Sequence, residues 1–447
     1  MEWTLELVQT RSAGERRRLT VAELGEVVAL SHVDEVGLGL TTAQRLLGNL
    51  QQAFVAIQET ALRAKAEQMR AGDPMLRLKD YRRRSLQTLF GAIRLRVPRL
   101  TCVASGRKPP VVLVGSRRSS LAYDRLRARL GAWMSYRAAA KLIAELFPLA
   151  SGRHASTVQQ HVLREADRLA RRPAILNPED PDDAASIDLG LDTTFIRSCA
   201  TDGPRRHKVL IGIGVDDRGQ EAKIGGVLAA VDPPHRLVSD ALRFLARGPA
   251  TEVTTFTDGA KLLRQLLRKA GVKASPILDW QHIHRPAGAG HQAGRQGLAR
   301  PDQRRAPGLP ANHRDPRQPA LAALAWSALG GEAPDGSSRT PAAALRHRSH
   351  PARTVAPARR LHTALGKLRD YADGQSAHFV NYCLRQRAGL PIGTSTTEGL
   401  ANTLVNRRMN KSQQMRWSVR GAHAVLVIRT AIGNGALAKP EAMAAAA

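Results

Sequence analysis

Three acidic residues stand where a carboxylate could bind a metal ion. Asp192 lies inside the apolar run GLDTTFIRS, Asp258 ends the run EVTTFTD, and Glu398 opens the helical segment EGLANTLV. A charge among apolar residues is costly unless it meets a cation. Mg²⁺ binds carboxylate oxygens together with substrate phosphates, and Mn²⁺ accepts the same kind of ligand. The three residues therefore predict an Mg²⁺ (or Mn²⁺) site that cuts and joins nucleic acid.

Two of these residues have simpler explanations as well. An aspartate before glycine, as at Asp258, is a common turn former. A glutamate in the first turn of a helix, as at Glu398, is favoured by the helix dipole. Asp192 has no such local explanation, because it stands in the middle of an apolar run. The prediction of a metal site therefore depends on the three residues together.

The charge balance indicates a polyanionic partner. Lys and Arg number 68 against 38 Asp and Glu, which gives a net charge of +30. Such a field favours binding to phosphate backbones, with an affinity that falls steeply as salt rises. We expect double-stranded DNA as the partner. A ribosome-like or membrane-surface basic protein is the alternative, but no amphipathic basic helix dominates the chain.

Cysteine usage and the chain's start indicate a compartment. Cys102, Cys199 and Cys383 lie far apart and form no CxxC pair, so neither a disulfide framework nor a zinc ribbon is expected. The first residues contain no apolar leader, and no stretch reaches membrane-spanning length. These features predict a cytoplasmic, nucleoid-associated protein with no membrane partner.

A sheet must bring the acidic residues together, and the segment 186–283 predicts one. Three apolar or alternating runs follow one another (SIDLGLDTTFIRS, HKVLIGIGVDD and AKIGGVLAAVD), and then helix and strand alternate up to SPILDW. This order is typical of an α/β protein with an RNase H-like fold, a mixed sheet with flanking helices. In that fold Asp192 would lie on the first, central strand, and Asp258 would follow the fourth strand beside it.

A basic β-hairpin is predicted over 81–103, with its turn at Phe90-Gly91. Ile93, Leu95 and Val97 alternate with arginines, so one face is apolar and the other cationic. A solvated outer face would explain any single arginine. The whole group is better explained by phosphate contacts: Arg82, Arg83, Arg84, Arg94, Arg96 and Arg99.

The segment 119–170 reads as helices separated by a turn. One helix ends before Pro148 and the next opens at Ser156, whose Gln159 completes a capping-box pattern. This layout is compatible with a helix-turn-helix. Its second helix would present four side chains to a DNA groove: Thr157, Gln159, Gln160 and Arg164.

An apolar stripe marks the helical N-terminal region. Its members are Leu46, Leu47, Leu50, Phe54 and Ile57. Their helical spacing is explained either by core packing or by a dimer seam. Both explanations stay open at this stage.

The chain after Glu398 reads as one long helix that carries cations. The residues expected near bound DNA are Asn406, Arg407, Arg408, Lys411, Met415, Arg416, Trp417 and Arg420. For Trp417, stacking on a base competes with a core or lid role.

The segment 284–360 differs from the rest of the chain. It contains no Lys, Ile, Phe, Tyr, Met or Cys, and so cannot bury enough apolar area to offset its ordering entropy. A natural disordered linker is one explanation. We favour the other, that GC-rich DNA is translated here in a wrong frame, entered after residue 283 and left near 361.

These residues carry a family resemblance. The stretches TLFGAIRLRVPRL, GLDTTFIRS, TFTDGA, ILDWQHI and STTEGLANTLVNRRMNKSQQMRW cover parts of 80–283 and 361–436. In them the chain resembles DDE transposases of bacterial insertion sequences, of the ISKra type, and distantly Mutator-like transposases. The resemblance implies that Asp192, Asp258 and Glu398 are the catalytic, metal-binding triad. It also places Asp279 and His282 close to the active site.

The resemblance further implies Mg²⁺-dependent cleavage and strand transfer at terminal inverted repeats by a homo-oligomer on DNA. The chain departs from the family pattern by lacking a cysteine pair before the basic hairpin, and by having the segment 284–360 where a helical insertion belongs. Two other functions stay open, a non-catalytic helix-turn-helix regulator and an RNase H-like nuclease. The expected regions are a helical N-terminus (1–75), a DNA-binding region (76–170), a linker (171–185), the catalytic core (186–283 and 361–436), the insertion (284–360) and a tail (437–447).

Overall fold

The structure is a computed structural model of the 447-residue chain. The residues that it describes are 4–10, 16–23, 39–102, 111–112, 117–148, 154–171, 183–279, 366, 370, 373–393, 395–410 and 415–437. The segment 284–360 lies outside these residues, so the expectation that it is translated in a wrong frame stays a prediction. The chain divides into two compact units, Met1–Arg172 with Arg420–Ala447, and Pro173–Val419.

A five-stranded mixed sheet forms the centre of the second unit. Its strands are β6 (Ser186–Arg197), β7 (Arg206–Asp216), β8 (Glu221–Val227), β9 (Glu252–Thr257) and β10 (Ile277–Leu278). The order across the sheet is β10-β9-β6-β7-β8. β7 pairs antiparallel with both β6 and β8, whereas β9 runs parallel to β6 and to β10. The strand that carries Asp192 is therefore central, and the strand before Asp258 is its neighbour, as the sequence predicts.

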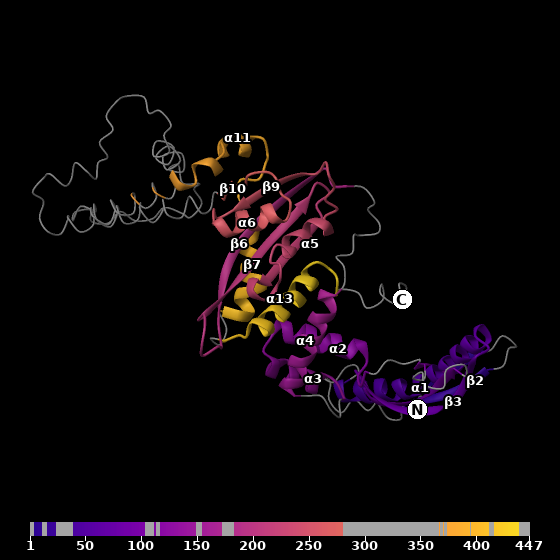
Figure 1. Ribbon diagram of the computed structural model, residues 1–447. Helices are drawn as coiled ribbons and strands as arrows, with labels where there is room; N and C mark the ends of the chain where they lie inside the picture. Colours follow the sequence, from indigo (N-terminus) through magenta and orange to yellow (C-terminus); the bar gives the residue numbers. More distant parts are fainter. Residues whose placement is uncertain are drawn as a thin grey trace, which may run out of the picture. The chain divides into compact units, whose positions relative to one another are not determined.

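Two helices cover one face of this sheet, α5 (Arg236–Phe244) and α6 (Lys261–Lys269), as Figure 1 shows. The alternation along β6 turns Ile187, Leu189 and Leu191 toward them, and these side chains join one buried cluster with apolar residues of both helices. Full burial of such a side chain contributes about 1.5–3 kcal/mol. This cluster is the main core of the unit.

The opposite face of the sheet carries Asp188, Gly190 and Asp192, because successive strand residues point to opposite sides. Helix α12 (Ser395–Ala401) contacts β6 and β7 but contributes no residue to the α5–α6 cluster. Ile211, which pairs with Asp192, is fully buried and also lies outside that cluster. We conclude that α12 packs on the face of the sheet that carries Asp192.

Shorter elements complete the second unit. These are the helical turns η1 (Leu228–Ala230) and η2 (Ser376–His378), the helix α11 (Tyr382–Arg387) and the π-helix η3 (Asn402–Asn410). The prediction of a single long helix after Glu398 is wrong. Trp417 is extended and bridges to Ser198 at the end of β6, with its N–H donating to the Arg197 carbonyl at 2.9 Å. This backbone pairing separates η3 from α13 (Val419–Gly433).

The first unit contains the predicted hairpin. β3 (Leu76–Thr88) pairs antiparallel with β4 (Gly91–Cys102), and the short β5 (Val111–Val112) pairs with β4. The hairpin is confirmed, although its first strand begins five residues earlier than expected and its turn residues are Leu89 and Phe90. Gly91 adopts a φ of 112°, which favours glycine after such a turn. A second hairpin pairs β1 (Thr4–Thr10) with β2 (Arg16–Glu23).

Helix α1 (Leu40–Gly72) packs along this sheet. Its Val55 and Leu62 contact the buried cluster of Ile93, Leu95 and Val97 on β4. Three members of the N-terminal stripe do not share this packing: Leu47, Phe54 and Ile57 are exposed. Core packing is therefore the wrong explanation for these three side chains.

Helices α2 (Leu121–Trp133), α3 (Tyr136–Leu146) and α4 (Ala155–Ala170) contact one another, and Arg429 on α13 donates to the Ala132 carbonyl at the end of α2. The prediction of a capping box at Ser156 is wrong. Helix α4 begins at Ala155, one residue before Ser156, and His154 occupies its N-cap without a side-chain hydrogen bond. In the described part of the chain, no helix has the length and apolar character needed to cross a membrane.

Candidate active site

Asp192 and Asp258 lie at the same level of the second unit's sheet. Ser186 pairs with Glu252 and Gly190 with Phe256, so β6 and β9 are offset by 66 residues. The same offset separates Asp192 from Asp258, so continuing the register brings the two aspartates side by side. Neighbouring strands lie about 4.8 Å apart. This places two half-buried aspartates just beyond the point where the parallel pairing of β6 and β9 ends, with Asp192 in the middle of β6 and Asp258 directly after the last residue of β9.

Local hydrogen bonds orient both carboxylates. Asp192 Oδ1 accepts from the N–H of Thr193 at 2.6 Å, and Asp258 Oδ1 accepts from the N–H of Ala260 at 2.9 Å. Gly259, with a φ of 82°, lets the chain turn from β9 into α6. Asp258 thus forms the turn that its sequence suggests. These contacts engage Oδ1 of each residue, and they leave the side chains partly accessible.

Asp279 adds a third strand to the acidic row, which consists of Asp192, Asp258 and Asp279. Ile277 pairs with Phe256 and Leu278 with Thr257, and the N–H of Asp279 donates to the Thr257 carbonyl at 2.9 Å. By the same register Asp279 lies opposite Asp258, but only 1% of Asp279 is exposed. His282, its expected companion, lies outside the described residues.

Glu398 belongs to α12, the helix that packs on the same face of the sheet as Asp192. Its side chain lies outside the described part of the structure, so the convergence of the three acids stays a prediction. Among the side chains that are described, no group of three or more His, Cys, Asp or Glu is close enough to hold a metal ion. Two carboxylates fit Mg²⁺ nevertheless, because this ion usually takes one or two carboxylates plus substrate phosphate.

Asp188 is a further acid on this face, and the sequence reasoning missed it. It precedes Asp192 by four residues on β6, and burial raises the pKa of its carboxyl, an effect that Arg385 on α11 opposes and Glu252 reinforces. The period-two spacing of Asp188 and Asp192 in SIDLGLD was the available signal.

The basic hairpin divides its arginines between two faces. Arg83 lies opposite Arg96, and Ser85 lies opposite Arg94, on the face away from Ile93 and Leu95. Arg83, Arg94 and Arg96 are exposed, and Arg96 also lies over the ring of Tyr81, 5.5 Å from its centroid. Like charges directly opposite one another destabilise a sheet. This outer face therefore suits a polyanion that would offset the repulsion.

The other three arginines of the group are placed differently. Arg82 and Arg84 lie opposite Val97 and Leu95, on the α1 side of the hairpin. Arg99 makes a bidentate ion pair with Asp80, whose hydrogen bonds lower the pKa of that carboxyl. The six-arginine patch inferred from sequence is therefore a patch of three on one face.

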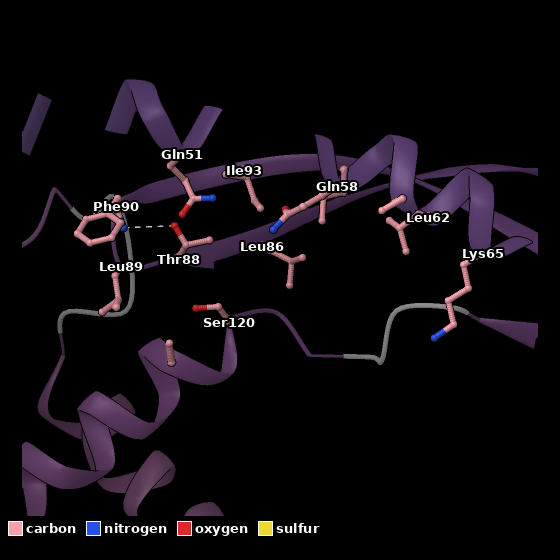
Figure 2. Close-up of a pocket in the computed structure, with 13 residues that line it drawn as sticks. Gln51, Gln58, Leu62, Lys65, Leu86, Thr88, Leu89, Phe90, Ile93 and Ser120 are labelled. Carbon is pink, nitrogen blue, oxygen red and sulfur yellow. Dashed lines mark hydrogen bonds between the residues drawn. The ribbon is translucent and has the colours of Figure 1, made fainter. Parts of the chain in front are cut away.

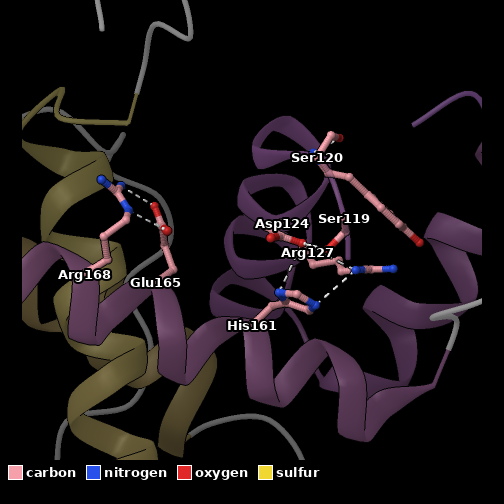
Figure 3. Close-up of polar contacts among 8 residues, drawn as sticks. Ser119, Ser120, Asp124, Arg127, His161, Glu165 and Arg168 are labelled. Atoms are coloured by element: carbon pink, nitrogen blue, oxygen red, sulfur yellow. Dashed lines mark hydrogen bonds and ion pairs between the residues drawn. The ribbon is translucent and has the colours of Figure 1, made fainter. Parts of the chain in front are cut away.

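On α4, three of the four side chains expected to reach DNA are exposed. Gln159, Gln160 and Arg164 face solvent, whereas Thr157 is half-buried. Behind them a buried network joins α4 to α2 (Figure 3). His161 Nδ1 lies 3.3 Å from Asp124 Oδ1, and its Nε2 lies 3.0 Å from Arg127 Nη1.

This network fixes the tautomer of His161. Because the guanidinium of Arg127 can only donate, Nε2 of His161 accepts and Nδ1 carries the proton that faces Asp124. Burial lowers the pKa of His161, and Arg127, Arg164 and Arg117 lower it further against the opposing effect of Asp124. Asp124 also accepts from Ser119, and on α4 Glu165 pairs with Arg168. These polar contacts hold the exposed face of α4 in place.

The cations after Glu398 also separate. Arg407 and Arg416 are exposed, and Lys411 lies outside the described residues. Arg408 is buried, with its guanidinium 4.9 Å from the ring of Trp417. Trp417 is itself buried, and its indole N–H points to the Met409 carbonyl at 3.4 Å. These contacts favour the packing role of Trp417 over stacking on a base.

A cavity of about 590 Å³ lies between α1, the hairpin and the start of α2 (Figure 2). Leu62, Leu86 and Ile93 line it together with Gln51 and Gln58. Among the described side chains that line it there is no carboxylate, histidine or cysteine. The described lining therefore offers no carboxylate ligands to compete with the acidic row.

No known family model matches this chain, and no curated protein matches it.

Proposed function

We propose that this chain is a DDE-type transposase, which binds the terminal inverted repeats of its own element and cuts and joins DNA strands. The observation that carries the proposal is the register of β6 and β9, which, continued by two residues, aligns Asp192 with Asp258 just past the carboxyl end of β9. Substrates of open α/β sheets usually bind at this edge. A pair of carboxylates there, in a chain of net charge +30, suits a phosphodiester substrate.

The strand order supports an RNase H-like core. Three antiparallel strands in sequence followed by two parallel ones, ordered β10-β9-β6-β7-β8, give the arrangement that we expect for this fold. Asp192 is on the central strand of that arrangement. The position of α12 against β6 and β7 supports Glu398 as the third acid.

Asp192 and Asp258 would hold Mg²⁺ (or Mn²⁺), and Glu398 would complete the site. When bound, such an ion activates a water or a 3′-hydroxyl as the nucleophile and stabilises the leaving oxygen. The protein's own contribution is to hold the carboxylates in fixed orientations. The bonds from Thr193 and Ala260 to their Oδ1 atoms do this.

DNA would be held by the first unit. The outer face of the hairpin offers Arg83, Arg94 and Arg96, and α4 offers Gln159, Gln160 and Arg164. Arginines on a flat sheet face suit phosphates, whereas side chains along one helix suit base edges in a groove. We propose that the hairpin supplies affinity and that α4, as part of a helix-turn-helix, supplies selectivity for the element ends.

The test uses the purified full chain with DNA that flanks its own coding region. We expect Mg²⁺-dependent cleavage at an inverted repeat, followed by joining of the freed 3′-end to a second DNA. An RNase H-like nuclease would cut but would not join. A helix-turn-helix regulator would bind this DNA and do neither, with or without the three acids.

A further inference from the structure

A second cavity lies beside α6 in the second unit. It has a volume of about 470 Å³, and it is lined by the polar side of α6, the segment before β10 and His378. Five lining side chains can carry positive charge: Lys261, Arg264, Arg268, Lys273 and His378. No acidic side chain from the described part of the chain lines the cavity. None of these residues belongs to the acidic row or to the arginine face of the hairpin.

The sequence of α6 explains how the cations are gathered. Leu263, Leu266 and Leu267 are buried in the core of the unit. The remaining face carries Lys261, Arg264 and Arg268, which advance about 10 Å along the helix axis. The stretch 261–275 contains no Asp or Glu.

Ordinary helix electrostatics accounts for only part of this pattern. A cation in the last turn, such as Arg268, interacts favourably with the helix dipole, whereas Lys261 in the first turn does not. Arg264 and Arg268 are like charges four residues apart, an arrangement that destabilises a helix. A solvated helix face would relieve this repulsion with acidic residues of its own, and α6 contains none. An anionic ligand would relieve it.

Neighbouring contacts hold two of the side chains in place. Arg264 Nη1 donates to Gln375 Oε1 at 2.8 Å, and Gln375 Nε2 in turn points to the Gly259 carbonyl at 3.3 Å. His378 Nδ1 lies 3.0 Å from Ser275 Oγ. Burial lowers the pKa of His378, and Arg264 lowers it further. His378 therefore contributes a hydrogen-bonding ring near neutral pH rather than another charge.

We propose that this cavity binds phosphate-ester groups. Guanidinium and ammonium groups together match phosphate oxygens in charge and hydrogen bonding, and the volume accommodates a phosphate with its attached sugar. The phosphate has two possible sources, a nucleic-acid backbone or a small nucleotide. The site goes beyond the proposed strand transfer and does not depend on it.

The test compares the wild-type full chain with the double variant Lys261→Gln, Arg268→Gln. Both changed side chains are exposed, and the Arg264–Gln375 contact is kept. The matched control is Arg236→Gln, Lys269→Gln, which removes two exposed cations outside the cavity. The probes are inorganic phosphate, ATP and a fluorescent single-stranded oligonucleotide. EDTA is present throughout, so that strand cleavage cannot contribute.

Two readouts are followed. Phosphate or ATP should raise the pKa of His378, followed by NMR of ¹³C-labelled histidine and assigned with His378→Gln. This shift should be lost in the cavity variant and kept in the control. If the source is a nucleic-acid backbone, the cavity variant should also bind the oligonucleotide with a weaker salt dependence. The slope of log affinity against log salt concentration should become shallower by roughly 1.4, at about 0.7 per lost phosphate contact.

A nucleotide source would instead give the His378 shift with ATP and leave oligonucleotide binding unchanged. The proposal is overturned if no probe moves the pKa of His378, or if the cavity variant and the control behave alike. Neither result bears on whether the chain cuts DNA, because no cutting is measured. Failure of this proposal is thus separate from failure of the proposed function.

Discussion

The two main sheets of this protein use charge in opposite ways. The five-stranded sheet aligns Asp192, in the middle of β6, with Asp258 and Asp279, which directly follow the neighbouring parallel strands β9 and β10. The three-stranded sheet spreads arginines over one exposed face, with Arg83 directly opposite Arg96. In the first sheet the charges are few, half-buried or buried, and set by register. In the second they are exposed and set by simple alternation.

This difference separates two physical demands. A carboxylate site requires oxygens at defined positions, so one residue of register shift would turn a side chain to the wrong face. Binding to a phosphate backbone requires mainly charge density, and each contact contributes in a similar way. We therefore expect changes at the acidic row to act all-or-none on chemistry, and changes at the hairpin to act gradually on affinity.

The largest effect is expected from Asp192→Asn. The variant should lose DNA cleavage and joining by about 10³-fold or more, because a lost metal ligand removes several kcal/mol of transition-state stabilisation and each 1.36 kcal/mol is tenfold in rate. DNA binding should stay within about twofold. The measurements are strand cleavage in Mg²⁺ and binding in EDTA.

The control for this variant is Asp202→Asn, which changes an exposed carboxylate in the β6–β7 loop. It should retain full activity. If Asp192→Asn cleaves DNA at the rate of this control, the acidic row is not the catalytic site, and the comparison between the two sheets loses its functional meaning.

The next effect concerns the hairpin. Reversing Arg94 and Arg96 to Glu should weaken binding to all DNA sequences by roughly 50-fold at 0.1 M salt. The slope of log affinity against log salt concentration should become shallower by about 1.8, at about 0.9 per lost phosphate contact. The measurement is a salt titration of duplex binding. Arg45→Glu, at an exposed position of α1, serves as the control. Loss confined to one DNA sequence would mean that these arginines read bases.

Much of this comparison could be anticipated from the sequence. Alternation of Ile93, Leu95 and Val97 with arginines specifies the hairpin faces, because strand periodicity is local. Asp192 stands out because a charge inside an apolar run needs a partner. The offset of 66 residues between β6 and β9 was not readable, because it depends on how the intervening strands and helix pack.

Sequence reasoning went wrong where tertiary contacts override local pattern. Helical propensity continues through Trp417, yet this residue is extended because its backbone pairs with Arg197 and Cys199 at the end of β6. Arg82 and Arg84 belong to the same basic cluster as Arg83 in the sequence, but the pleat turns them to the α1 side. Neither outcome follows from the residues alone.

A third prediction extends the comparison to α1, which lies against the arginine-bearing sheet. Leu47, Leu50, Phe54 and Ile57 follow the three-four spacing of a coiled-coil seam, and all but Leu50 are exposed. We expect this stripe to pair two copies of the chain. Phe54→Ser with Ile57→Ser should weaken self-association by about 10-fold or more, since each lost apolar contact is worth about 1.5–3 kcal/mol.

Sedimentation equilibrium of the full chain measures this association. Thr60→Ser, on the same helix, is the control. A wild-type chain that stays monomeric at high concentration, with and without DNA, would exclude the seam. Two copies would place two arginine faces on one DNA, whereas each acidic row would still act alone.

The smallest effect tests whether the network behind α4 is held by a neutral histidine. The pKa of His161 is lower in the folded chain than its ordinary value of 6.5, mainly because of burial. The unfolded chain therefore binds a proton at a pH where the folded chain does not. The contribution of His161 to the free energy of unfolding should be fully present above about pH 6.5 and should fall as the pH drops toward the folded pKa. In that range a proton on Nε2 would face Arg127, 3.0 Å away, with Arg164 and Arg117 also nearby.

Replacing His161 with Asn should flatten this part of the curve of Tm against pH, whereas replacing the exposed His154 with Asn should leave it unchanged. His423, whose pKa is also lowered by burial, contributes to the wild-type curve in the same direction, so the difference between variants is the quantity to measure. If the His161→Asn curve keeps the wild-type slope between pH 5 and 7, the neutral histidine does not hold α4, and the exposed face of that helix depends on apolar packing alone.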